Sequence, residues 1–138
     1  MGIYKQPTIY NCGGGFKPSF DECLIKNVNT SIVRDYTFTK IYKSDELKIL
    51  FGSLWGYIDV NEMATGSNKL FDIDDIVLMS DVSFPFNGGA FWVNKDGTTL
   101  NIITQYSIKK NGEVDLFKPT STSGNKTFFS SAIICAIE

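Results

Sequence analysis

The sequence predicts an all-β fold: an antiparallel β-sandwich, jelly-roll-like, that follows a short irregular N-terminal segment. Three observations support this prediction. About eight segments with strand character recur at intervals of roughly ten residues, with turn residues between them. No segment has the apolar spacing of a long helix. Aromatic residues make up 14% of the chain and charged residues only 20%, a balance that suits packed sheets and argues against disorder.

A chain of 138 residues is most simply one domain. Residues 1–30 are expected to form an irregular lead-in, and residues 31–138 the sandwich. Within the lead-in, Ser19 and Glu22 have the spacing of a capping box, which predicts one short helical turn. The nearby glycine run lacks the Lys-Ser/Thr that completes a phosphate-binding loop, so no phosphate site is expected.

Residues 32–42 and 47–61 predict the first two strands. The first range is rich in β-branched and aromatic side chains and contains neither glycine nor proline. The second range alternates in the way of a strand with one buried face. The inward face is expected to consist of Leu54, Gly56, Ile58 and Val60, and the outward face of Ser53, Trp55, Tyr57 and Asp59.

Residues 90–118 predict a three-stranded antiparallel meander, because apolar residues fall on alternate positions between two glycine turns. At the second turn, a two-residue loop would put the apolar sets on opposite faces. A three-residue loop, residues 110–112, ending in a left-handed glycine removes this conflict. The expected pairs are then Ile108 with Val114 and Tyr106 with Leu116.

The first turn of the meander, Asp96-Gly97, is expected to be a two-residue loop. Such a loop pairs Val93 with Leu100 and turns Trp92 outward. The next strand is expected to run without a break from Thr98 to Lys110.

The remaining segments predict shorter strands and one long terminal strand. Residues 61–68 are a polar turn region, and residues 69–73 and 76–79 are short strand candidates. Residues 128–137 are apolar at both odd and even positions, which is typical of a strand buried on both sides. In a two-layer sandwich this burial requires a central strand or a subunit contact.

Composition excludes several classes of function. The net charge is −2 and the basic residues are scattered, so neither nucleic acid nor an anionic membrane is an expected partner. The chain has no apolar stretch of about eighteen residues, and its first ten residues lack the apolar core of a signal peptide. Neither a membrane span nor export by the general pathway is expected.

The cysteines and the absence of histidine limit the possible chemistry. The three cysteines, Cys12, Cys23 and Cys135, form no CxxC pair, so free thiols in a reducing cytoplasm are expected, with a Cys12 to Cys23 bridge as the alternative. The chain contains no histidine, which excludes histidine-based catalytic triads and removes the commonest metal ligand. No cofactor or metal is expected.

Two groups of carboxylates are candidates for a functional role. Residues 72–75 begin like a calcium loop, but the EF-hand glycine and the distal Glu are absent, so a solvated loop is the preferred interpretation. Asp59, Glu62 and Asp81 could supply a pair of carboxylates for glycoside hydrolysis, although nothing in the sequence sets two of them at the required separation. The sequence therefore favours a protein that is not an enzyme.

The candidate ligand-binding residues are Trp55, Tyr57 and Asp59, joined by Trp92. Flat aromatic rings beside a carboxylate suit a sugar, whose C–H face stacks on the ring while its hydroxyls donate to the acid. The alternative is that these aromatic side chains pack under a second sheet or at an oligomer interface.

Four segments follow one another in a distinctive order. They are LWGYIDVN (54–61), FPFNGGAFWVNKDGTTLNI (84–102), YSIKKNGEVDLF (106–117) and FFSSAIICAIE (128–138). In this order of strands and turns the chain resembles the distal domains of bacteriophage receptor-binding proteins, the tail-fibre and baseplate tips that recognise host surfaces. The resemblance implies a jelly-roll head, a homotrimer, and saccharide binding on exposed surfaces or between subunits. It transfers no individual site residue.

The predicted function is a non-enzymatic adhesion module of a phage or prophage particle that binds a host cell-surface glycan. Such a protein is made in the bacterial cytoplasm and assembled into the virion tail with other tail proteins. The heads of this family normally follow a stalk, and only a short segment precedes the first sandwich strand here. The alternative is therefore a structural tail or baseplate component that joins subunits without binding glycan, and a small carbohydrate-active enzyme ranks third.

Overall fold

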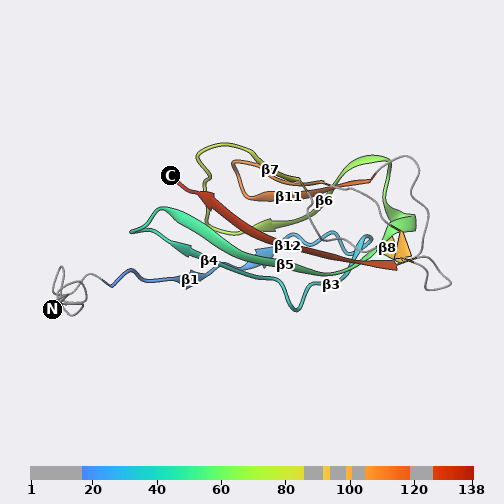
Figure 1. The fold of residues 1–138 in the computed structure, drawn as a ribbon, viewed down its shortest axis with the longest axis horizontal. Helices are drawn as coiled ribbons and strands as arrows, with labels where there is room; N and C mark the ends of the chain where they lie inside the picture. The colour runs from blue at the N-terminus through green and yellow to red at the C-terminus, as the bar shows by residue number, and fades with distance from the viewer. Residues whose placement is uncertain (1–16, 86–91, 94–98, 101–104, 119–125) are drawn as a thin grey trace, which may run out of the picture.

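The computed structural model describes residues 17–85, 92–93, 99–100, 105–118 and 126–138, and this part of the chain is almost entirely β. Two antiparallel sheets, one of seven strands and one of five, pack face to face, as Figure 1 shows. The predicted all-β sandwich is confirmed.

The seven-stranded sheet is built around its two longest strands. Its members are β1 (Asp21–Glu22), β3 (Val33–Asp35), β4 (Lys40–Ser44), β5 (Ile49–Asp59), β8 (Trp92–Val93), β9 (Thr99–Leu100) and β12 (Lys126–Ala136). The strand order is β1-β4-β5-β12-β8-β9, and β3 pairs with β5 beyond the end of β4. β5 and β12 pair antiparallel over all eleven residues of each strand, so they form the rigid centre of this sheet.

The five-stranded sheet has the order β2-β6-β11-β10-β7. Its strands are β2 (Ile25–Lys26), β6 (Gly66–Ile73), β7 (Val82–Pro85), β10 (Gln105–Ile108) and β11 (Glu113–Lys118). The chain passes from β5 to β6, and so from one sheet to the other, through a single-turn 3-10 helix, η1 (Val60–Glu62).

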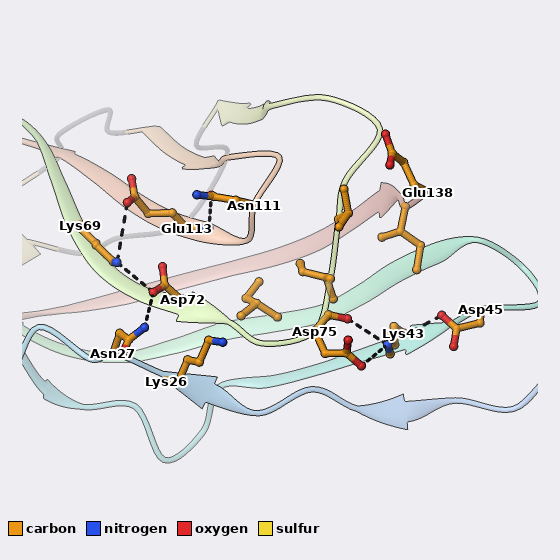
Figure 2. Close-up of a pocket in the computed structure, with 14 residues that line it drawn as sticks. Lys26, Asn27, Lys43, Asp45, Lys69, Asp72, Asp75, Asn111, Glu113 and Glu138 are labelled. Carbon is orange, nitrogen blue, oxygen red and sulfur yellow. Dashed lines mark hydrogen bonds and ion pairs between the residues drawn. The ribbon is translucent and has the colours of Figure 1, made fainter.

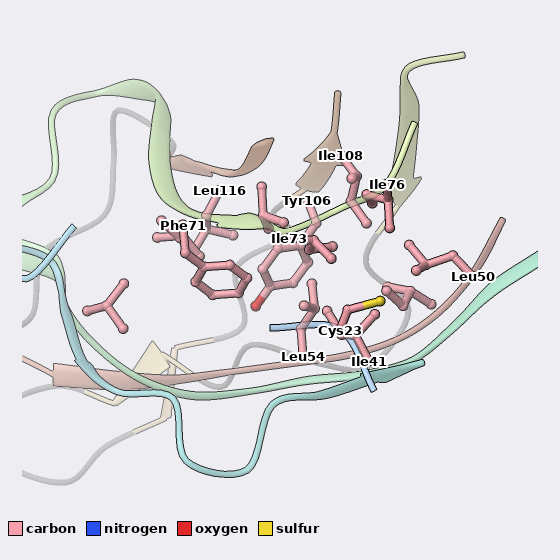
Figure 3. Close-up of a cluster of buried hydrophobic side chains, with 14 of the residues drawn as sticks. Cys23, Ile41, Leu50, Leu54, Phe71, Ile73, Ile76, Tyr106, Ile108 and Leu116 are labelled. Atoms are coloured by element: carbon pink, nitrogen blue, oxygen red, sulfur yellow. The ribbon is translucent and has the colours of Figure 1, made fainter. Parts of the chain in front are cut away.

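The core lies between the sheets and follows the predicted alternation of β5. Leu54 and Ile58 are fully buried, and Val60 is almost fully buried. Phe71 and Tyr106 are the largest fully buried side chains, and they meet this row from the five-stranded sheet, as Figure 3 shows. Since each fully buried side chain of this kind stabilises the fold by roughly 1.5 to 3 kcal/mol, the inward residues are the main source of stability.

The hairpin between β10 and β11 confirms the predicted three-residue loop. Tyr106 lies opposite Leu116 and Ile108 opposite Val114. Gly112 has a positive φ of 90°, and a Cβ at this position would lie 2.5 Å from the Ile73 carbonyl oxygen. The glycine is therefore needed for both its backbone conformation and its small size.

The predicted meander of residues 90–118 is wrong. β8 and β9 belong to the seven-stranded sheet, whereas β10 and β11 belong to the five-stranded sheet. The strand predicted to run from Thr98 to Lys110 is thus divided between two sheets. Alternation shows which side chains face the core, but both sheets face the same core, so alternation does not identify the sheet.

The predicted register at the first turn of the meander is also wrong. Leu100 pairs with Trp92 and not with Val93, which pairs with Thr99. The observed register differs by one residue from the register that a two-residue loop requires. Asp96-Gly97 itself lies outside the described residues.

The helical turn predicted from Ser19 and Glu22 is wrong as well. The Ser19 hydroxyl donates instead to Glu46 Oε1 at 2.9 Å, across the fold. The short strands β1 and β2 occupy this part of the expected lead-in, and they pair with β4 and β6 of the two different sheets. Strand pairing with distant segments therefore takes the place of the helix cap that was expected at Ser19.

Three further strand predictions need adjustment. Residues 32–42 divide into β3 and the start of β4, with a turn between them. Residues 76–79 form a single bridge at Leu78 and no strand. On β12, Ile133 is buried as expected, but Ile134 on the opposite face is 69% exposed, so burial of both faces is not reached within one chain.

Candidate functional site

The outward face of β5 presents two exposed aromatic side chains in a row. Trp55 is 46% exposed and Tyr57 is 37% exposed, whereas their neighbours Leu54 and Ile58 are fully buried. Successive side chains of a strand point to opposite faces, so this contrast follows directly from the alternation. The sequence prediction of an outward aromatic face on β5 is confirmed for these two residues.

Trp55 lies where β5 changes its neighbour. β4 pairs with β5 from Ile49 to Ser53, and β3 pairs with it at Tyr57 and Ile58, which leaves the backbone of Trp55 between them. Because an unpaired backbone group that is shielded from water is costly, this gap needs a substitute partner.

Thr39 is that partner. The Trp55 N–H donates to Thr39 Oγ1 at 3.0 Å, and the Thr39 hydroxyl donates to the Trp55 carbonyl oxygen at 3.0 Å. One hydroxyl can serve both groups because it is at once a donor and an acceptor. Thr39 is buried, so it fixes the backbone beneath the exposed indole.

The turn between β3 and β4 adds a third ring. Phe38 is 56% exposed and lies against Trp55, with ring centroids 5.2 Å apart and an interplanar angle of 37°. The carboxylate of Asp35 accepts hydrogen bonds from the Thr37 hydroxyl at 2.6 Å and its N–H at 2.8 Å. These two hydrogen bonds stabilise the turn and lower the pKa of Asp35. Phe38, Trp55 and Tyr57 are called the aromatic platform below.

Asp59 and Arg34 form a polar edge beside the platform. The Arg34 guanidinium donates to Asp59 Oδ2 at 3.3 Å and to the Thr30 carbonyl oxygen at 3.1 Å. Asp59 Oδ1 also accepts the N–H of Asn61 at 3.2 Å and thereby caps η1. The predicted carboxylate is therefore part of an ion pair, and a bound hydroxyl would meet the pair and not an isolated acid.

Trp92 does not share a cross-strand row with the other predicted residues. Thr127 of β12 lies opposite Trp92 on one side and opposite Ile58 on the other. Trp92 thus stands in the row of Ile58, two strands away, and not in the row of Tyr57. The structure brings together Trp55, Tyr57 and Asp59.

Phe38 and Thr39 belong to the candidate site but are not among the residues that the sequence predicts for it. The sequence predicts a continuous strand over residues 32–42 instead. The signal that could have revealed the turn is the Asp-x-Thr spacing of Asp35 and Thr37, which favours a local side-chain to backbone bond over strand pairing.

The carboxylates of residues 72–75 take part in ion pairs and hydrogen bonds. Asp72 and Asp75 line a polar groove of about 630 Å³ at one end of the sandwich, which Figure 2 shows. Each of the three carboxylates in residues 72–75 is engaged by a cationic or amide side chain. The contacts are Lys69 to Asp72 at 2.9 Å, Asn27 to Asp72 at 2.8 Å, Lys43 to Asp75 at 2.9 Å, and Lys26 to Asp74.

These contacts argue against a calcium loop. Burial would raise the pKa of Asp72, but the hydrogen bonds from Asn27 and Lys69 outweigh it and lower that pKa. Among the residues that the structure describes, no three Asp, Glu, His or Cys side chains are grouped so as to hold a metal ion. The solvated loop of the preferred interpretation is a turn whose carboxylates are paired with lysines.

The remaining candidates for catalysis, Asp81 and the two described cysteines, form structural contacts or are largely buried. Asp81, weighed with Asp59 for hydrolysis, accepts the N–H of Lys110 at 2.6 Å and belongs to the five-stranded side of the sandwich. Burial raises the pKa of the Cys23 thiol to about 11 and also raises that of Cys135. Both thiols are free and are protonated at neutral pH, which makes them poor nucleophiles.

Comparison with known proteins gives no relative for this chain: no protein-family model, no curated protein and no solved structure matches it. Within the described ranges, no helix has the length and apolar character needed to span a lipid bilayer.

Proposed function

We propose that this chain is a non-enzymatic adhesion module that binds a host cell-surface glycan through its aromatic platform. The observation that carries the proposal is that the exposed rings are held in place by specific contacts. The Trp55 ring packs against Phe38, and the Thr39 hydroxyl hydrogen-bonds to both backbone groups of Trp55. A preformed surface of this kind binds without the cost of ordering flexible loops.

The chemistry of the platform suits a sugar. Sugar rings offer a face of C–H groups that stacks on an aromatic ring, and hydroxyl groups that need hydrogen-bond partners. Trp55 and Tyr57 supply the rings, and the Arg34–Asp59 pair supplies both a donor and an acceptor at the edge. No covalent step is required of any of these residues.

The biological setting that we propose rests on the resemblance to phage receptor-binding tips. On this proposal the module belongs to a phage or prophage particle, is made in the bacterial cytoplasm and is assembled into the virion tail with other tail proteins. It acts as a homotrimer, so that several weak sugar contacts combine on one cell surface.

A second candidate function is a structural component that joins subunits without binding glycan. The observation that favours it is Ile134, which is 69% exposed on the outward face of β12, beside the exposed Ala132 and Ala136. An aliphatic patch of this kind is typical of a surface covered by another subunit.

A glycan array and a melting curve distinguish the two candidates. Under the adhesion proposal the wild-type chain binds saccharides, and Trp55→Ala abolishes binding with little change in melting temperature. Phe117→Ala is the matched control, because Phe117 is 45% exposed on the five-stranded sheet and is expected to play no part in binding. A Trp55→Ala variant that dissociates or unfolds, while its folded fraction still binds sugar, would overturn the adhesion proposal.

Light scattering tests the proposed trimer independently. A monomer at micromolar concentration contradicts the homotrimer and weakens the structural candidate, since a component that joins subunits is expected to self-associate.

A further inference from the structure

A second aromatic group lies on the same outward face as the platform. Tyr42 of β4 stands directly opposite Phe51 of β5, and their rings stack with centroids 5.6 Å apart and an interplanar angle of 25°. Phe20 meets Phe51 edge-on, with centroids 5.4 Å apart, and is 47% exposed. Phe20, Tyr42 and Phe51 are called the second aromatic group.

The two groups are aligned along one strand. Phe51 and Trp55 share the outward face of β5 and are separated by roughly 14 Å, since a strand rises about 3.4 Å per residue. The surface between them is polar: Ser53 is exposed, and opposite it Lys40 donates to Glu22 at 2.9 Å. Along β5 the outward surface is therefore aromatic at Trp55, polar at Ser53 and aromatic again at Phe51.

Two cations among the described side chains beside the two groups are each paired with a carboxylate. Arg34 is paired with Asp59 next to the platform, and Lys40 is paired with Glu22 next to the second group. A further carboxylate, Asp35, carries a negative charge at the platform turn. An acidic sugar would find these two cations engaged and additional carboxylates nearby, so the described side chains of this face favour an uncharged ligand.

The aliphatic side chain of Ile134 extends the second group. It lies opposite Phe51 across the β5–β12 pair and is largely exposed. The C–H face of a sugar packs on aliphatic and aromatic carbon alike, so Ile134 widens the apolar surface on which a ring can rest.

We propose that the ligand is a neutral, extended glycan chain that lies along β5 and contacts both the platform and the second aromatic group. This inference rests on the proposed function and adds the substrate class to it. Each group alone is a small exposed surface that binds weakly. A chain long enough to reach both converts the second contact into an intramolecular one, which strengthens binding without any new type of contact.

The test uses cello-oligosaccharides and chito-oligosaccharides of increasing length as neutral probes, and oligogalacturonides as acidic probes. Titration calorimetry on the wild-type chain is expected to give weak binding of the neutral disaccharides and binding about a hundredfold tighter for the longest neutral chains. The acidic series is expected to show no comparable gain.

Two variants separate this inference from the function on which it rests. Phe51→Ala is expected to remove the gain with chain length together with weak disaccharide binding at the second group, while disaccharides still bind at the platform; Trp55→Ala is expected to remove both the gain and the binding at the platform. Phe117→Ala is the control and changes neither. Because Phe51 is partly buried, the more exposed Phe20→Ala serves as a second variant, and melting curves confirm that each variant is folded.

The failures are distinguishable. If the wild-type chain binds no saccharide, neither here nor on the array, the proposed function falls and the inference with it. If Trp55→Ala loses binding but Phe51→Ala and Phe20→Ala bind long chains as tightly as the wild type, only the inference is overturned. Preferential binding of the acidic series likewise overturns the neutral substrate class alone.

Discussion

The two sheets bury their inward faces in the same way, but their outward faces differ. The seven-stranded sheet presents rings, with Phe38, Trp55 and Tyr57 at one end and Phe51 further along β5. The five-stranded sheet presents lysines and carboxylates that bind one another. The inward residues thus determine the fold, while the outward residues make one sheet largely aromatic and the other largely charged.

The charged face is centred on Asp115. Its side chain is only 7% exposed, and Lys109 lies 3.3 Å from it while also binding Glu113. Burial raises the pKa of Asp115 most, the charge of Glu113 raises it further, and Lys109 opposes both. These groups form a network of ion pairs around Asp115, in which Asp115 Oδ1 is buried without a hydrogen-bond partner among the described residues.

The largest loss of stability is expected from truncating a side chain of β5 that faces the core. Ile58→Ala should lower the free energy of unfolding by about 2 to 5 kcal/mol, because it leaves a cavity in the core. Ser53→Ala on the outward half of the same strand should change it by less than about 0.5 kcal/mol. Urea denaturation measures both, and similar values for the two variants would contradict the assignment of faces.

A smaller effect is expected from removing the support beneath the rings. Thr39→Val keeps the shape of the side chain but leaves the Trp55 N–H and carbonyl without their partner, which should cost about 1 to 3 kcal/mol. Thr37→Val, at an exposed position of the same turn, is the control and should cost less. If the two variants have the same denaturation midpoint, Thr39 does not hold the platform.

On the charged face, a smaller loss of about 1 kcal/mol is expected from Lys109→Met, since it leaves Asp115 and Glu113 without their shared cation. The double variant Lys109→Met/Asp115→Asn should recover most of the loss, because the buried charge is then absent. A double-mutant cycle by chemical denaturation tests this coupling, and additive effects would show that Lys109 and Asp115 are independent.

The smallest effects are expected from pH, and two carboxylates of the five-stranded sheet should respond with opposite signs. The pKa of Asp72 is lowered in the folded chain, so its ionised form stabilises the fold above the ordinary value of 3.8, and this contribution is lost as pH falls through the lowered pKa. Asp72→Asn should therefore melt below the wild type at pH 7 and approach it in acid.

Asp115 is the counterpart in this comparison. Its pKa is raised in the folded chain, so its ionised form destabilises the fold at neutral pH, and stability is gained as pH falls through the raised pKa toward 3.8. Asp115→Asn should melt above the wild type at pH 7 and converge with it in acid. Melting temperatures measured across this range check both variants, and identical shifts of the same sign would contradict the assignment.

Sequence reasoning succeeded where a local rule was sufficient. The β10–β11 loop was predicted because only a three-residue turn with Gly112 aligns the apolar sets of both strands. The faces of β5 were predicted because alternation over a long strand is unambiguous. The sequence therefore predicts Trp55, Tyr57 and Asp59 on one face, where the structure has them.

It failed where a distant partner decides the structure. Ser19 forms no helix cap because Glu46, twenty-seven residues away in the chain, takes its hydroxyl. The strand expected over residues 98–110 is divided because both sheets accept the same alternation. Phe38 and Thr39 were missed because their role depends on the gap between β3 and β4 along β5, which local pattern does not reveal.

The hydroxyl of Thr39 has a consequence for the solubility of the folded chain. Unpaired strand backbone is a template to which a strand from another molecule can add, and this is a first step toward domain swapping and fibrils. At Trp55 the backbone of β5 lies in the gap between β4 and β3, but both of the groups that an added strand would need are occupied by Thr39. A single threonine thus closes this gap in the pairing of β5 to strand addition, while the rings above it stay exposed.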